Sequence, residues 1–557
     1  MKQTNNAKDS VTGFAQLETF LSRNHQMIFY ISLVVMCLFG LSLFNLRISE
    51  GGDDSAYISR AMDLLASGRY PSYQGPLYPM FLSVVLALVG FNLTILKLTS
   101  FLFILLGQWL TYLTFRNRTG FIMLFATLFL SAVNSWYLFF ASQTYSEAMF
   151  ILIQNGFIYL FLNFFNHKSV QSPVAQMTSL AVVAFIILLA FLSRTAGFGL
   201  AIAAVLFLIA YKYYRQALYL TGLFAFMLVV WLGVRSIMWE QIPNSGKQMH
   251  ELMQKHPYDS TQGEEDLAGF GQRFVDNSRL YLSKHFVKMI GFKKSDNKEH
   301  NGWITLLLYV LFLYALYKSY CDNRNLFFIG LYLAVMLGIT FVSLQKLWDQ
   351  YRLIVPYLPL MVFFMLYGLY QLFAGIKKGR YLSLLLVLIF SGFVSSASRS
   401  VRQVDIPVLV SNLHGNKYEG YTPDWENFLR ISEYVGKNLG ADSYVACRKP
   451  DMARLYAGGK KFYGIFRFDD EDADLLLNAL KNKGVTHLLL ASLRKNPEIN
   501  SGDVINTLHR YMGFIVQKYP NAFELVHQIG VEEPAYLFRI NYNAVNNDLS
   551  NQSDIVE

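Results

Sequence analysis

The chain has 557 residues, of which 54% are hydrophobic and only 15% are charged. Charged residues make up about a quarter of an ordinary soluble chain, so this composition excludes that class and indicates a membrane protein. The formal net charge of +10 is not accompanied by an Arg/Lys-rich tract or a nucleic-acid motif, which argues against a nucleic-acid partner. Its three cysteines, Cys37, Cys321 and Cys447, lack metal-ligand spacing, so neither a disulfide framework nor a thiolate metal site is expected.

Apolar segments long enough to cross a bilayer as helices recur through the first 400 residues. Eleven are predicted, over residues 27–46, 93–115, 120–140, 146–165, 178–192, 196–214, 217–238, 304–317, 325–344, 353–373 and 381–394. A shorter apolar run, 77–91, contains Pro79. If this run does not cross, every short cluster of Lys and Arg falls on one face of the membrane, as the positive-inside rule requires. We therefore interpret 77–91 as re-entrant or interfacial, with a cytoplasmic N-terminus (1–26) and an external C-terminus.

The first external loop, 47–92, follows directly on the first span. It places Asp53 and Asp54 behind a Gly-Gly pair, followed by a helix over 56–66 and a Pro- and Tyr-rich turn. Two carboxylates at a membrane surface are costly unless they are solvated, paired or bound to a ligand. The alternative is a solvated loop in which Asp54 or Ser55 caps the helix.

Three further polar motifs fall on the same predicted face. Glu147 begins the fourth span, Arg194 lies at the break between two spans, and Tyr351-Arg352 precedes Pro356 and Pro359. Alone, Glu147 could simply complement a helix N-terminus, and each Arg could anchor the interface. Together they predict a cavity for a lipid-linked phosphate, because guanidinium groups bind phosphate bidentately and a carboxylate can accept a proton from a hydroxyl. Few charges lie mid-span, which argues against a transporter.

A long external loop, 239–303, separates the seventh and eighth spans. Its second half, 273–292, is typical of an interfacial helix, because apolar residues alternate with Lys and Arg. Its histidines, His250, His256 and His285, lack ligand spacing and are predicted to be surface residues.

The chain from 399 to 541 has a globular composition, with helices alternating with short β-rich runs. Helices are predicted over 424–439, 471–483 and 504–518, and strands over 443–447, 461–466, 485–491, 523–528 and 535–540. This alternation indicates a small external α/β domain, and no phosphate-binding or catalytic motif is found in it. The polar tail, 542–557, is predicted to be disordered.

The order of these elements resembles the GT-C membrane glycosyltransferases that use polyprenyl-phosphate sugars, especially the protein O-mannosyltransferases and the lipid A aminoarabinose transferase. The resemblance rests on short motifs spread over nearly the whole chain. These are Asp53-Asp54 with Tyr57, Gly75-Pro76-Leu77-Tyr78-Pro79, Tyr145-Ser146-Glu147, Arg194 to Gly197, Tyr351-Arg352 with its prolines, and 444–450 of the external domain.

The resemblance implies a transmembrane catalytic domain (27–398) of about 11 spans and an external domain (399–541). It implies direct inverting transfer of a hexosyl or pentosyl group from a polyprenyl-phosphate donor to a hydroxyl of an envelope glycan, lipid or protein, on the outer face of a bacterial inner membrane. Asp53 would be the general base, with Asp54 or Glu147 assisting it or binding a divalent metal, the one cofactor left open. Arg194 and Arg352 would hold the phosphate, and Tyr57, Tyr78 and Tyr351 would contact substrate. The alternatives are an O-antigen-ligase-like transferase with a diphosphate-linked donor and a lipid or polysaccharide transporter.

Overall fold

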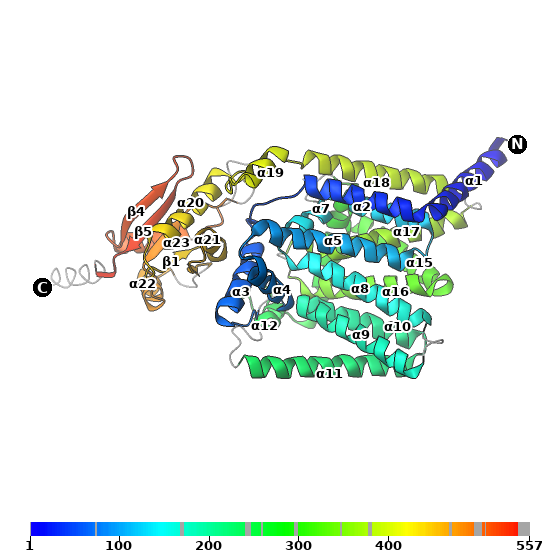
Figure 1. The fold of residues 1–557 in the computed structure, drawn as a ribbon, viewed down its shortest axis with the longest axis horizontal. Helices are drawn as coiled ribbons and strands as arrows, with labels where there is room; N and C mark the ends of the chain where they lie inside the picture. The colour runs from blue at the N-terminus through cyan, green and yellow to red at the C-terminus, as the bar shows by residue number, and fades with distance from the viewer. Residues whose placement is uncertain are drawn as a thin grey trace. The chain divides into compact units, whose positions relative to one another are not determined.

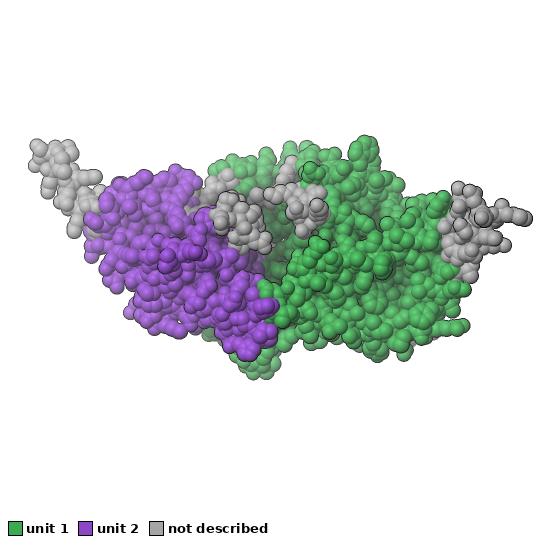
Figure 2. Space-filling model, turned by 90° about the horizontal axis from the view of Figure 1, so that it is seen from above, with its two compact units in different colours: residues 1–45, 60–406 green, residues 46–59, 407–557 purple. Residues whose placement is uncertain are grey.

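The computed structural model describes residues 2–72, 75–167, 172–239, 247–257, 260–293, 299–345, 348–376, 381–466, 471–494, 504–506 and 508–543. The chain forms two compact units, distinguished by colour in Figure 2. The helical unit comprises residues 1–45 and 60–406, and the sheet unit comprises residues 46–59 and 407–557. The predicted tail beyond 543 lies outside the described residues.

The helical unit is built from long apolar helices, many of which run roughly parallel to one another (Figure 1). Among the described residues, nine helices are long and apolar enough to cross a membrane. They are α2 (His25–Ser42), α5 (Leu93–Phe115), α8 (Ser146–His167), α9 (Pro173–Ser193), α11 (Tyr214–Met238), α15 (Gly302–Asp322), α16 (Arg324–Ser343), α17 (Leu358–Gly375, preceded by the short turn η6, Val355–Tyr357) and α18 (Leu382–Arg402). The predicted polytopic helical domain is confirmed.

Two predicted spans take a different form from a single long helix. The 120–140 segment is a bent pair, α6 (Phe121–Ala132) followed by α7 (Ser135–Leu138) and η1 (Phe139–Ser142), with a bend of 59°. The bend occurs at Asn134, whose side chain accepts from the Tyr137 amide at 3.1 Å and donates to the Met289 carbonyl at 2.7 Å. A side chain that caps a new helix in this way ends the preceding one.

The second is α10 (Phe198–Ala210), joined to α9 by the turn η2 (Thr195–Gly197). It has 13 residues, as does α4 (Leu77–Val89), the segment interpreted as non-crossing. Thirteen helical residues rise about 20 Å, less than the roughly 30 Å of a hydrocarbon core. Where the chain is described, nine or ten helices are thus long and apolar enough to span, against eleven predicted.

Helix α8 is one of the interior helices of this unit, with α16 and α17. In its most apolar window 61% of the residues are buried, against 17% in α11 and in α15. It packs against α5 and α9, while the apolar outer faces of α11 and α15 are left for lipid. A polar residue at the start of α8, such as Glu147, is therefore inside the bundle and not at its periphery.

The loop 239–303 is largely helical where it is described. It contains α12 (Lys247–Met253), η3 (Ser260–Gln262), α13 (Leu267–Ser278), the π-helix η4 (Arg279–Phe286) and α14 (Val287–Met289). The predicted helix is confirmed, but the prediction that it lies at an interface is wrong for its second half. Residues 281–287 are all buried, and α13 and η4 pack against α16 and α15.

The sheet unit is a mixed five-stranded sheet with helices on its faces (Figure 1). The strands are β1 (Val445–Cys447), β2 (Phe462–Gly464), β3 (His487–Leu490), β4 (Phe523–Ile529) and β5 (Ala535–Ile540), in the order β2-β1-β3-β5-β4. Strand β1 is parallel to β2 and β3, with Val445 opposite Phe462 and His487, whereas β5 is antiparallel to β3 and β4. The predicted α/β domain is confirmed, and each predicted strand is found.

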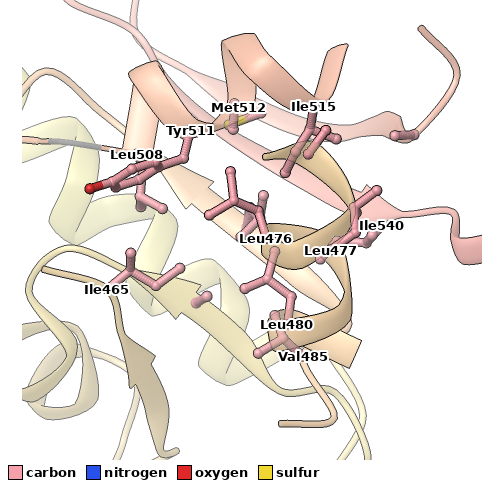
Figure 3. Close-up of a cluster of buried hydrophobic side chains, with 14 of the residues drawn as sticks. Ile465, Leu476, Leu477, Leu480, Val485, Leu508, Tyr511, Met512, Ile515 and Ile540 are labelled. Carbon is pink, nitrogen blue, oxygen red and sulfur yellow. The ribbon is translucent and has the colours of Figure 1, made fainter. Parts of the chain in front are cut away.

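Helices α22 (Ala473–Asn482) and α23 (Leu508–Lys518) pack together in a buried hydrophobic core of the sheet unit, which Figure 3 shows. Leu476, Leu477 and Leu480 of α22 meet Tyr511 and Ile515 of α23 in one buried cluster. Helix α20 (Pro423–Asn438) packs against β3, β4 and β5. The sequence analysis did not predict α21 (Pro450–Tyr456), which follows β1, or α19 (Ile406–Leu413). The remaining helices are α1 (Lys2–Arg23) and α3 (Asp53–Ser67), and the boundary between the units falls within α3.

Candidate functional site

The predicted acid pair begins α3, in the part of this helix that belongs to the sheet unit. Gly52 precedes the pair with φ +91°, a backbone conformation that favours glycine. Asp54 is completely buried and its Oδ2 accepts the Ser49 amide at 3.2 Å, whereas Asp53 is only partly buried. Tyr57, one turn after Asp53, is buried. The two aspartates thus differ. Asp54 stabilises the turn between Ser49 and α3 through its hydrogen bond, whereas Asp53 is partly exposed to solvent.

The helical unit brings three predicted site residues into direct contact. Glu147 is completely buried at the start of α8, and its Oε1 lies 2.7 Å from Arg194 Nη1 and 3.2 Å from Arg352 Nε. The side chains of both arginines are 21% exposed. One carboxylate and two guanidinium groups carry a net charge of +1, at a point that a ligand can reach. This arrangement can bind an anion.

Aromatic rings surround Arg352. Its Cζ lies 5.0 Å from the centre of the Tyr145 ring, a cation–π distance. The neighbouring Tyr351 ring meets Trp136 edge-on at 4.4 Å and lies near Phe140. Burial raises the pKa of Tyr351, so its hydroxyl stays neutral. The rings hold the Arg352 segment in one orientation and limit its access to water.

Arg194 is placed by a tight turn at the end of α9. Its backbone is extended (φ −150°, ψ 134°), and its amide still donates to the Ala190 carbonyl at 2.9 Å. A Cβ on Gly197 would collide with the Ala190 backbone, so this turn requires glycine. A Cβ on Gly75 would likewise collide with the carbonyls of Leu192 and Ser193. The predicted Gly75-Pro76 motif therefore lies directly against the turn that presents Arg194.

A polar cluster that the sequence analysis missed anchors the segment carrying Arg352. Lys284 and His285, consecutive on the π-helix η4, both bind Asp349: Lys284 contacts Oδ2, and His285 Nε2 lies 2.7 Å from Oδ1. Partial burial would raise the pKa of Asp349, but its hydrogen bond from Lys284 and its contact with His285 hold it below its ordinary value. Burial lowers the pKa of His285 to about 4, despite the neighbouring Asp349.

Other contacts secure the same segment. Tyr281 Oη donates to the Trp348 carbonyl at 2.6 Å, and Gln154 Nε2 donates to the Pro356 carbonyl at 2.9 Å. The prediction that His285 is a surface residue is wrong, because it is buried against Asp349. No spacing rule could have found this cluster, because 64 residues separate His285 from Asp349. The one available signal was the unusual density of Lys and His in an otherwise apolar stretch.

The predicted site residues thus form three groups in the structure. Glu147, Arg194, Arg352 and Tyr351 come together in the helical unit, and Asp53, Asp54 and Tyr57 share the start of α3. Tyr78 is completely buried in α4, with its hydroxyl 3.3 Å from Ser100 Oγ, so its place is in the packing of the helices. Among the described residues, no group of three or more His, Cys, Asp or Glu side chains could hold a metal ion.

Comparison of the sequence with known proteins finds no matching family model and no matching curated protein. Comparison of the fold does find similar structures. The archaeal oligosaccharyltransferase AglB from Archaeoglobus fulgidus, in complex with an inhibitory peptide and a dolichol-phosphate, matches 92% of this chain and 74% of its own, with a TM-score of 0.53 and 13% identity. ArnT from Cupriavidus metallidurans, in the apo state, matches 96% of this chain and 99% of its own, with a TM-score of 0.50 and 12% identity. The chain therefore has the GT-C fold that its motifs predict.

Proposed function

We propose that this protein is a glycosyltransferase that moves a sugar from a polyprenyl-phosphate donor to a hydroxyl acceptor at the outer face of a bacterial inner membrane. The observation that carries the proposal is the buried Glu147 held between Arg194 and Arg352, in a fold shared with two similarly organised proteins. A dolichol-phosphate is bound in the AglB complex, and a lipid of this class, without its sugar, is what the proposed reaction would release.

The two arginines are suited to the phosphate of the donor. A guanidinium group offers parallel N–H donors that match two phosphate oxygens, and this geometry is stronger than a single charge contact. Glu147 fixes the orientation of both groups through one oxygen, at 2.7 and 3.2 Å. In our proposal Glu147 positions the arginines, while the arginines stabilise the negative charge of the departing polyprenyl phosphate.

Asp53 is our candidate for the general base, because it is less buried than Asp54, whose carboxylate already accepts a backbone amide. The acceptor O–H would give its proton to Asp53 as the acceptor oxygen attacks the anomeric carbon. The bond from that carbon to the phosphate oxygen would break, and the polyprenyl phosphate would leave with the bonding electrons. Attack from the face opposite the leaving group inverts the anomeric centre. The acceptor would be an envelope lipid, glycan or protein.

Substitution of Asp53 tests this function directly. Purified Asp53→Asn protein in lipid vesicles should lose roughly 10²- to 10⁴-fold in the rate of transfer from a synthetic polyprenyl-monophosphate sugar, the range for loss of a general base. Asp63→Asn, nearly three turns further along the same helix, is the matched control and should retain the wild-type rate. Full transfer by folded Asp53→Asn protein would rule out Asp53 as the base.

The donor and the enzyme class need a separate measurement. Product formed only from a diphosphate-linked donor would favour the ligase-like alternative. Flux of lipid or polysaccharide through the vesicle membrane without any glycosidic product would identify a transporter instead.

A further inference from the structure

The segment that carries the acid pair, residues 46–59, folds with the sheet unit although about 350 residues separate it from the rest of that unit. Three side chains of the sheet unit donate hydrogen bonds to its backbone carbonyls. Tyr421 Oη reaches the Ile48 carbonyl at 2.7 Å, and Arg454 Nη1 reaches the Ser59 carbonyl at 3.3 Å. Between them, Lys449 Nζ reaches two consecutive carbonyls, of Glu50 at 2.9 Å and of Gly51 at 3.1 Å.

The contacts around the Lys449 side chain restrict it to one position. It lies at the start of α21, its Nζ is 5.9 Å from the centre of the Trp425 ring, and a Cβ built on Gly52 would lie 3.4 Å from that Nζ. Burial and the adjacent Arg448 lower the pKa of Lys449 to about 8, while Asp53 and Glu50 oppose this shift. These three groups are the charged neighbours that act on it.

The contact of Lys449 with the Glu50 and Gly51 carbonyls is important because it lies just before the start of α3. Gly51 and Gly52 have wide backbone freedom, so the sequence alone does not determine the direction in which α3 starts. An ammonium group shared by two successive carbonyls fixes the two peptide planes that lead into Gly52, the residue before Asp53. The direction of the Asp53 side chain then follows from the start of the helix.

We infer that Lys449 is a positioning residue for the acid pair, and that the sheet unit is the scaffold on which the pair is built. The inference rests on the proposed function, since it assigns a role toward the proposed base. It goes beyond that function, because it predicts that the chemistry depends on one side chain of the sheet unit. A misplacement of about 1 Å at a reacting group can lower the rate by about 10²-fold.

Lys449→Met tests the inference, because methionine retains much of the apolar stem and removes the donors. We expect its kcat to fall at least tenfold while the donor KM stays within about twofold, since the arginines that would bind the donor are untouched. The matched control is Lys460→Met. Lys460 Nζ also caps two consecutive carbonyls, of Leu439 at 3.0 Å and Gly440 at 2.7 Å, but these lie within residues 407–557. Its kcat should equal that of the wild type.

The pH profile gives a readout that a merely structural lysine would not change. Wild-type kcat should decline above about pH 8, where Lys449 loses its proton. Lys449→Arg stays protonated, so it should retain partial activity and extend the plateau to higher pH. If Lys449→Met does not fold, Lys449→Leu, which also keeps an apolar stem and removes the donors, should show the same loss of kcat.

Wild-type kcat in folded Lys449→Met protein would overturn the inference, provided that Asp53→Asn is inactive in the same assay. In that case the proposed function stands and only the role of Lys449 fails. Full activity of Asp53→Asn overturns the assignment of the base itself, and with it the reason for positioning it. Equal losses of kcat in Lys449→Met and Lys460→Met would also overturn the inference, because the loss would then reflect general damage to the sheet unit.

Discussion

At the scale of single residues, the decisive feature is that one buried carboxylate binds two arginines. Removing one member of a buried ion pair leaves uncompensated charge and commonly costs about 3–5 kcal/mol. The arginines here are 21% exposed, so we expect a smaller cost, about 2–3 kcal/mol. Glu147→Gln should therefore lower the thermal midpoint of the purified protein and raise the donor KM at least tenfold, because the two guanidinium groups repel each other and lose their common anchor.

A double-substitution cycle separates stability from function at this site. Glu147→Gln/Arg194→Gln removes one positive charge along with the negative one, so part of the lost stability should return while the donor KM stays high. Glu426→Gln is the matched control, because its ion pair with Arg430 is exposed and such pairs contribute little. A wild-type donor KM in Glu147→Gln would contradict the role of this residue as a positioning group.

The sequence predicts this cluster better than it predicts the role of each member. Arg194 and Arg352 stand out because they lie at span ends on the predicted external face, where the positive-inside rule leaves few basic residues, and both contact Glu147. Tyr78 belongs to the Gly75-Pro79 motif, and a motif alone does not predict that this tyrosine is buried beside Ser100. Which side chain is buried depends on neighbours that are distant in the sequence.

At the scale of elements, the segment between α16 and α17 is fixed by a helix that precedes it by sixty residues. The neutral His285 donates to Asp349, and its pKa is lowered from 6.5 to about 4 by burial. Between these two values the unfolded chain binds a proton that the folded protein does not. Protonation of His285 therefore leaves the free energy of unfolding unchanged above pH 6.5, and it lowers that free energy as the pH falls toward 4.

The lowered pKa of His285 predicts that acid destabilises the segment between α16 and α17, which His285 holds through Asp349. Between pH 7 and pH 5 the wild type should lose up to about 2 kcal/mol of stability through His285. His285→Gln cannot be protonated and should show a smaller drop in thermal midpoint over the same range. His414→Gln, at an exposed histidine, should behave like the wild type. Equal pH dependence in the wild type and His285→Gln would show that His285 is not protonated on unfolding in this range.

Hydrophobic periodicity and turn residues predict the regular helices and strands of this chain, but they do not predict its irregular elements. The strands β1 to β5 and the helices α20, α22 and α23 follow their predicted ranges closely, because alternation and apolar faces are local signals. The π-helix η4 and the bend at Asn134 depend on contacts with distant backbone carbonyls. The assignment of residues 46–59 to the sheet unit depends on Tyr421, Lys449 and Arg454, which no local pattern connects with Asp53.

At the scale of the whole molecule, the comparison with known structures supports the fold, whereas the proposed reaction rests on the site residues. The similar structures are only 12–13% identical to this chain, so they establish the architecture and leave the reaction to experiment. The reaction we propose requires that the acid pair and the sheet unit lie outside the cell. That requirement rests on the distribution of Lys and Arg among the short loops.

Cys321 allows this topology to be tested. It is exposed at the end of α15, between Lys318 and Arg324, and the positive-inside rule places this loop in the cytoplasm. In a background with Cys37 and Cys447 replaced by alanine, a membrane-impermeant maleimide should label Cys321 only after the cells are permeabilised. Lys437→Cys, at a site that is 71% exposed in α20, should be labelled in intact spheroplasts when Cys321 is replaced by alanine. Labelling of Cys321 from outside together with protection of Lys437→Cys would reverse the topology and place Asp53, which folds in the same unit as Lys437, in the cytosol, where the proposed external transfer could not occur.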